Sequence, residues 1–89
     1  MEKSTQSPHY LVVRKKLVEM RKAAGLTHRQ LAERLGREHS FVWRIEQGER
    51  RLDLVEFFWV CRALEQNAAS VYAELVAGLE RLEPRKTKK

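Results

Sequence analysis

Side chains that could take part in molecular recognition gather in one stretch of the chain, residues 27–51. Arg44 can donate two parallel hydrogen bonds to a flat pair of acceptors, and His39 and Ser40 can each supply one. Glu38 could accept a hydrogen bond, or could interact favourably with a helix N-terminus. Each of these residues could equally be a solvated surface group. A binding surface therefore requires elements that hold these side chains on one face.

The residues that could take part in catalysis do not form an arrangement typical of an enzyme. The sequence contains no Gly-rich phosphate loop and no nucleophile–base motif. Cys61 falls in a predicted core stripe, which favours a buried apolar role over a nucleophile. His9, His28 and His39 stand apart, so no metal spacing is present. We therefore expect no enzyme activity, no metal and no cofactor, and no small-molecule ligand is evident.

Two short helices joined by a turn at Gly36 are predicted to position the polar side chains. Thr27 and Gln30 form a T-x-x-Q capping box at the start of the first of these helices. Gly36 can close it in the left-handed conformation. The second helix is predicted over residues 38–47, with Val42 and Ile45 facing inward. The residues that then face outward are His39, Ser40, Trp43, Arg44 and Gln47.

Three further helices are expected around this pair. Apolar residues at helical spacing predict a helix over residues 9–24 and another over residues 68–82. A helix over residues 53–65 is predicted from the cap formed by Asp53 and Glu56, with Leu54, Phe57 and Cys61 on its core face. A second side of this helix is also apolar, which indicates that more than one neighbour covers it. No strand signal is present, and we predict an all-α fold with five helices around one core.

The basic residues of the chain have two interpretations. The chain has 89 residues and a formal net charge of +6, and four of these charges come from residues 85–89. Arg14 and the lysines near it on the first helix could form a solvated face or a rim that contacts phosphate. We expect a disordered arm over residues 1–8, one domain over residues 9–82 and a disordered basic tail over residues 83–89. A single cysteine and the lack of a signal-peptide pattern favour a reducing, cytoplasmic location.

The pattern L-T-x-x-Q-L-A-x-x-L-G followed by S-F-V-x-R-I-E-x-G resembles the lambda-repressor-like, Cro-type helix-turn-helix family, also called the XRE family. The resemblance covers roughly residues 13–76. It implies a compact bacterial or phage domain that binds double-stranded DNA and regulates transcription, in the cytoplasm at the nucleoid. In this family the second helix of the motif enters the major groove. The resemblance thus implies a sequence-specific regulator, and we expect a repressor.

The resemblance also implies roles for individual residues. Positions that read bases are occupied here by Glu38, His39, Ser40 and Arg44. Trp43 departs from the family pattern, as does Phe41, because small or polar residues are usual there. An aromatic residue at either position could contact a thymine methyl group or pack on the sugar edge, or it could instead fill a gap against a neighbouring helix. Contacts to phosphate are implied for His28 and Gln47, and Arg51 could also meet the DNA backbone. Arg21 and Glu46 match positions that form an ion pair in many members.

Assembly and rival functions follow from the apolar surface. We expect a homodimer on a palindromic operator, because one recognition helix reads only a few base pairs. We expect no membrane partner. The residues predicted at its interface are Trp59, Val76, Leu79 and Leu82. An alternative is a protein-interaction module or antitoxin-like adaptor with the same fold. A nonspecific nucleic-acid binder that relies on the basic tail is the third hypothesis.

Overall fold

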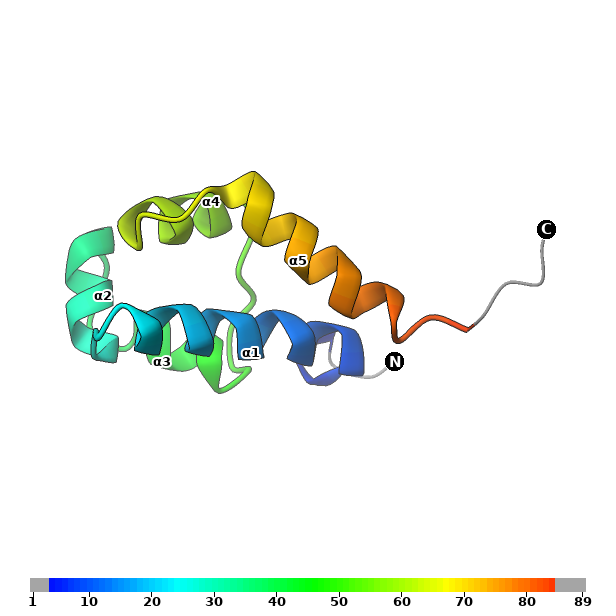
Figure 1. Cartoon of the computed structure of the whole chain (residues 1–89). Coiled ribbons are helices and arrows are strands. Elements are labelled where there is room, and N and C mark those ends of the chain that lie inside the picture. Colours follow the sequence, from blue (N-terminus) through cyan, green and yellow to red (C-terminus); the bar gives the residue numbers. More distant parts are fainter. Residues whose placement is uncertain (1–3, 85–89) are drawn as a thin grey trace.

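The computed structural model describes residues 4–84, and this part of the chain consists of helices and loops without a strand (Figure 1). A short 3-10 helix, η1 (Ser4–Gln6), precedes five α-helices. These are α1 (Pro8–Ala23), α2 (His28–Leu35), α3 (Phe41–Glu46), α4 (Leu54–Ala63) and α5 (Ala68–Glu80). The predicted all-α class with five α-helices is confirmed. We had expected no order before Pro8, whereas η1 is helical and packs against α1.

Side-chain caps fix where the helices begin. The Thr27 hydroxyl accepts a hydrogen bond from the amide of Gln30 at 3.1 Å, and the Gln30 side chain accepts one from the amide of Thr27 at 2.9 Å. Asp53 and Glu56 form the same reciprocal pair at the start of α4. Asn67 caps α5 through the amide of Ser70 at 2.9 Å. Because a helix start leaves amides unpaired, these caps set the boundaries locally.

The third helix begins later than the sequence predicted. It spans Phe41–Glu46 rather than residues 38–47, so Glu38, His39 and Ser40 lie in the turn before it. The amide of Phe41 bonds to the carbonyl of Glu38, a 3-10 type step, and the α-helical pattern starts with Arg44 bonding to Ser40. Ser40 makes no side-chain cap. The turn therefore tightens into a helix only at Phe41.

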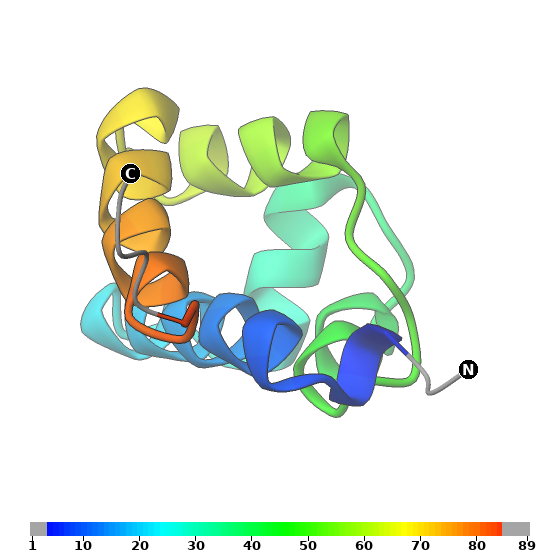
Figure 2. The ribbon, with the colours of Figure 1, turned by 90° about the vertical axis from the view of Figure 1, so that its right-hand side faces the viewer.

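The core lies between α1, α2, α3, α4 and α5. Val42 and Ile45 face inward from α3, and Phe57, Val60 and Cys61 face inward from α4. Figures 1 and 2 show α3 and α4 on opposite sides of the molecule, with α2 running between them. Leu54 was predicted in the core but is 77% exposed. It is the first residue of α4. The helices that pack against α4 are α2 and α5, and they leave the outer side of Leu54 uncovered.

None of the helices in residues 4–84 combines the length and the apolar character that crossing a bilayer requires.

Candidate nucleic-acid interface

The α2–α3 unit is a helix, a tight turn and a second helix. Gly36 closes α2 with φ +67°, in the left-handed region that glycine adopts without steric cost. The amide of Arg37 then bonds back to the carbonyl of Ala32 at 3.0 Å, which pairs one of the free carbonyls at the end of α2. The chain thereby turns toward α3 within a few residues. The turn predicted at Gly36 is confirmed.

The predicted contact residues surround α3 on its outer side. Glu38, His39, Trp43, Arg44, Gln47 and Arg51 are exposed, and His28 and Ser40 are half-buried. Trp43 and Arg44 project from α3 itself, whereas Glu38, His39 and Ser40 are presented by the turn. The Nε2 atom of His39 lies 3.6 Å from the Glu33 carboxylate on α2. Hydrogen-bonding groups from the turn and the helix thus share one surface.

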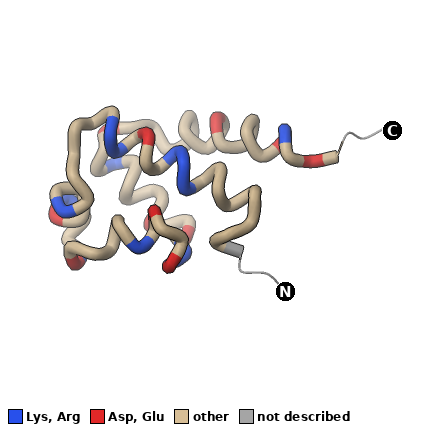
Figure 3. Tube along the Cα trace, turned by 90° about the horizontal axis from the view of Figure 1, so that it is seen from below, with Lys and Arg blue, Asp and Glu red and all other residues tan. Residues whose placement is uncertain are grey.

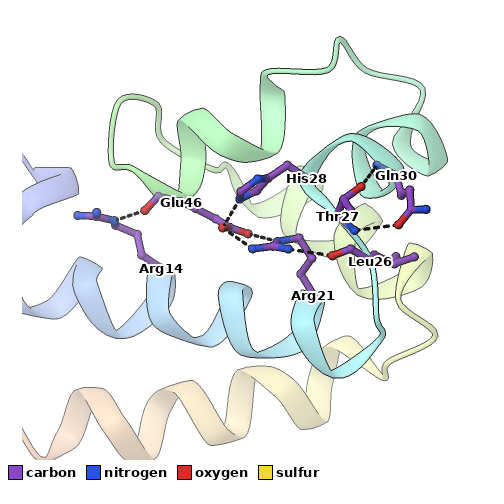
Figure 4. Close-up of polar contacts among 7 residues, drawn as sticks. All are labelled: Arg14, Arg21, Leu26, Thr27, His28, Gln30 and Glu46. Carbon is purple, nitrogen blue, oxygen red and sulfur yellow. Dashed lines mark hydrogen bonds and ion pairs between the residues drawn. The ribbon is translucent and has the colours of Figure 1, made fainter.

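Glu46 joins the other side of α3 to the rest of the domain (Figure 4). Its carboxylate accepts hydrogen bonds from Nε of Arg21 at 2.7 Å and from Nη2 of Arg21 at 3.0 Å. Arg21 also donates to the carbonyl of Leu26 at 2.8 Å, in the loop before α2. The Arg21 and Glu46 side chains are only 9% and 5% exposed. This pair therefore fixes α3 relative to α1 and to the start of α2.

His28 has a partner that the sequence did not indicate. Its Nε2 atom lies 2.8 Å from Oε1 of Glu46, the oxygen that also accepts from Nη2 of Arg21, and its side chain is 36% exposed (Figure 4). The ring therefore links the first turn of α2 to α3. A contact between His28 and phosphate would have to use Nδ1. The resemblance supplied a role for this position but could not indicate a contact between residues eighteen positions apart.

Arg14 is an internal connection rather than a solvated residue. Its Nε donates to the backbone carbonyl of Glu46 at 3.0 Å, and Nη1 donates to the carbonyl of Thr5 at 3.1 Å. Gly48 lies beside it with φ +80°, and a Cβ atom there would come within 2.8 Å of Arg14 Nη1. Both the backbone conformation and the lack of space favour glycine. Arg14 thus connects η1, α1 and the end of α3. Neither predicted role, a solvated helix face or a rim that contacts phosphate, describes this connection.

A second charged cluster surrounds Phe41, which is 1% exposed. The guanidinium groups of Arg37 and Arg50 lie 4.0 Å and 4.9 Å from the centre of its ring. Both arginines bind the buried Glu56 on α4, at 3.2 Å for Arg37 and 2.8 Å for Arg50. The hydrogen bond from Arg50 is the main reason why the pKa of Glu56 falls from 4.5 to about 2. Glu56 thus holds the segments that enter and leave α3.

The sequence analysis missed most of this cluster. It identified Glu56 as a helix cap and noted Phe41 as unusual for the family. The available signal was an aromatic residue between two arginines, Arg37 and Arg50, in a chain with few aromatic residues. That pattern does not identify a partner on another helix. Of the two roles left open for Phe41, filling a gap against a neighbouring helix is the one observed.

The residues predicted at the dimer interface line three different hollows. Val76 and Leu79 line a shallow hollow on α5 with Tyr72, whereas Leu82 borders a hollow between α1 and α5. Trp59 lines a third hollow, between α2 and α4. All are exposed or half-buried. Two separate apolar surfaces are therefore available, one on α5 and one on α4.

Charge and reactive groups give little additional indication of a site. Basic and acidic positions are interleaved along the backbone trace (Figure 3). Within residues 4–84, no group of three His, Cys, Asp or Glu residues is arranged to hold a metal ion. Cys61 is fully buried, and burial raises the pKa of its thiol. Such a thiol is a core group rather than a nucleophile.

Comparisons with known proteins agree with this geometry. The model of the helix-turn-helix domain family matches residues 15–73. A solved structure titled XRE-family like protein, from Pseudomonas syringae pv. tomato str. DC3000, is 42% identical, with 78% of this chain and 84% of that chain covered and a TM-score of 0.74. The clp gene regulator ClgR from C. glutamicum is 21% identical, with 90% of this chain and all of that chain covered and a TM-score of 0.70, which shows a shared fold. None of the curated proteins matches the chain.

Proposed function

The chain belongs to the XRE type of the helix-turn-helix domain family and is a DNA-binding transcription regulator; from this premise we propose that it reads a specific double-stranded site with α3 in the major groove. Members of this family are regulatory DNA-binding proteins, and we propose no enzyme activity for this one. We place it in the cytoplasm, at the nucleoid.

The observation that supports this proposal is the division of α3 into two sides. Val42, Ile45 and Glu46 are buried against the domain, while Trp43 and Arg44 are exposed. A helix held on one side by apolar contacts and an ion pair presents its other side in a fixed position. Rigid placement is what base reading requires, because hydrogen bonds to a base edge tolerate little displacement.

We assign base contacts to Arg44 and Trp43 on α3 and to Glu38, His39 and Ser40 in the turn. Arg44 suits a guanine edge, Glu38 suits a cytosine amino group, and Trp43 suits a thymine methyl group. Phosphate contacts are assigned to residues at the rim of this surface, namely His28, Gln47 and Arg51. The phosphate contacts would set the register of the domain on DNA, and the base contacts would set its specificity.

We further propose that the protein acts as a homodimer on a palindromic operator and represses transcription by occupying it. A two-fold dimer would place two copies of α3 on successive turns of the duplex. Repression by occupancy needs only tight binding to DNA. The α5 surface is the interface that we favour, and its test is given in the Discussion.

Selection of bound sites from random duplex DNA tests the function directly. We expect a palindromic consensus and a preference for it over unrelated DNA of about a thousandfold or more. Binding measured at several salt concentrations should weaken linearly in log salt. Enrichment without a consensus would contradict specific reading, and a consensus without symmetry would contradict the dimer.

The alternative function, a protein-interaction module, is favoured by one observation. Four large apolar side chains on α4 remain exposed, which a DNA contact through α3 does not explain. This surface is distinct from the proposed DNA contact, because α3 and α4 lie on opposite sides of the molecule (Figure 2).

A further inference from the structure

The outer face of α4 is more apolar than a soluble surface normally is. Leu54, Val55, Phe58 and Trp59 are 77%, 54%, 45% and 50% exposed. Their spacing places them on one side of the helix, opposite Phe57, Val60 and Cys61 in the core. Contiguous exposed apolar surface of this kind usually marks a contact with another molecule. The question is which molecule covers it.

Beside this face lies a hollow between α2 and α4, with a volume of about 470 Å³. Its apolar lining comes from Leu35, Trp59 and Ala63, and its charged lining comes from Arg34 and Arg62. Arg34 donates to the carbonyl of Ala63 at 2.9 Å, which holds α2 against the end of α4. The Arg62 guanidinium lies 5.8 Å from the centre of the Phe58 ring. The surface thus combines an exposed aromatic pair, a concave site and two arginines.

We propose that this face, the α4 face (Leu54, Val55, Phe58, Trp59, Arg34 and Arg62), binds an acidic amphipathic segment of another protein. Apolar side chains of that segment would cover Phe58 and Trp59 and enter the hollow. Its carboxylates would meet Arg34 and Arg62. Aromatic residues and arginines are the types most often found at the energetic centre of protein interfaces. The chemistry of this site therefore matches a hydrophobic and acidic partner.

Other occupants fit less well. Residues 85–89 are Arg-Lys-Thr-Lys-Lys, which are neither apolar nor acidic and do not match this site. A second copy of the chain would present the same basic and apolar groups to this face in a two-fold contact, and among the described residues no carboxylate lines the hollow to meet Arg34 and Arg62. A lipid surface would cover the convex side of α4 but would leave the hollow unfilled.

The α4 face remains accessible when α3 is bound to DNA. Figures 1 and 2 place α4 on the opposite side of the molecule from α3, with α2 between them. A partner could therefore bind the protein on its operator. This inference goes beyond the proposed function and does not depend on it, because the α4 face can be tested without DNA.

The test uses three fluorescent peptides that share a helical design. The first carries leucine and phenylalanine on one side and glutamate on the other, the second replaces glutamate with lysine, and the third replaces the apolar side with glutamine. Fluorescence anisotropy gives the affinity of each for the full chain. Trp59→Ala and Arg62→Glu alter the α4 face, and Leu11→Ala on α1 and Arg81→Glu at the end of α5 are controls at exposed positions outside it. Circular dichroism melting shows that each variant is folded.

We expect the acidic amphipathic peptide to bind at least about tenfold more tightly than either other peptide. Trp59→Ala and Arg62→Glu should each weaken it by about tenfold or more, while Leu11→Ala and Arg81→Glu leave it unchanged. Prior binding of duplex DNA should not reduce peptide affinity.

Four results would overturn the inference. The first is equal affinity for the acidic and basic peptides, and the second is displacement of the peptide by DNA. The third is a wild-type dimer that Trp59→Ala converts to monomers in sedimentation, which would identify a second copy as the occupant. The fourth is tighter binding to phosphatidylglycerol vesicles than to the peptide, lost in Trp59→Ala, which would identify a membrane.

Discussion

Arg44 is the residue whose chemistry is best suited to reading a base. It is exposed on α3, one position before the buried Ile45, and a guanidinium can donate two hydrogen bonds to guanine. We predict that Arg44→Ala lowers affinity for the selected operator by about 1–3 kcal/mol and relaxes the preference at one base pair in each half-site. Titration against the operator and against single-base variants measures both effects.

Arg81→Ala is the control for this change, because it removes an exposed arginine from the end of α5. It should leave the preference at every base pair intact. If Arg44→Ala kept full discrimination and lost affinity equally for all sequences, Arg44 would be a phosphate contact instead.

Glu56 gives a prediction that concerns pH. Its pKa lies at about 2 in the folded protein, against 4.5 for an ordinary glutamate, mainly because Arg50 donates to its carboxylate. A lowered folded pKa means that the charged form stabilises the fold at pH values above 4.5. This contribution, on the order of 3 kcal/mol, is lost as the pH falls from 4.5 toward 2.

Urea unfolding of wild type and Glu56→Gln at a series of pH values measures this contribution. We expect the wild type to be more stable near neutral pH, with a difference that shrinks below pH 4.5. A difference that stays constant down to the lowest pH would show that the Glu56 carboxylate is not the titrating group.

At the scale of the elements, Glu46 connects α3 to α1 and α2. Removing its carboxylate leaves the buried Arg21 without its charge partner, although Arg21 keeps its bond to the carbonyl of Leu26. We predict that Glu46→Ala lowers the free energy of unfolding by about 3–5 kcal/mol. Chemical denaturation measures it, and Glu33→Ala, which removes an exposed carboxylate from α2, is the control. Equal stability of both variants would contradict a buried pair.

The sequence predicted those elements whose boundaries are set by neighbouring residues. The caps at Thr27 and Asp53 and the left-handed Gly36 each act within a few positions, so a local pattern identifies them. The start of α3 was predicted at Glu38 instead of Phe41, and no side-chain cap bond marks the true start, because Ser40 makes none. Its position depends instead on Phe41, which packs between two arginines held by a residue of α4.

The candidate site was predictable only in part, because some of its contacts join positions that are far apart in the sequence. Helical spacing placed Arg44 and Trp43 on the outer side of the motif, where the structure also has them. The contacts of His28 with Glu46 and of Glu56 with Arg37 join residues eighteen or nineteen positions apart, from α2 to α3 in the first case and from α4 to the turn before α3 in the second. Sequence periodicity carries no information about such pairs. They become visible only once the helices are packed.

At the scale of the whole molecule, two apolar surfaces remain after folding, and they differ in chemistry. The α4 face is bordered by arginines. The α5 surface, defined by Tyr72, Val76 and Leu79, is bordered by Glu80 and Glu83. Trp59 belongs to the first surface, so an α5 dimer would not include it at its centre. We therefore assign the two surfaces to different contacts, a partner protein on α4 and a second copy on α5.

The α5 dimer can be tested by placing a charge in that surface. Leu79 is half-buried and lines the hollow with Val76, so Leu79→Glu should disrupt a two-fold contact between two copies of α5. Sedimentation should then show a folded monomer, and binding to the two half-sites, with copies of α3 about 34 Å apart, should lose cooperativity. Tyr72→Glu changes a residue that is 53% exposed, so it tests the same surface if Leu79→Glu fails to fold. Dimers that persist in the folded variants would place the interface elsewhere.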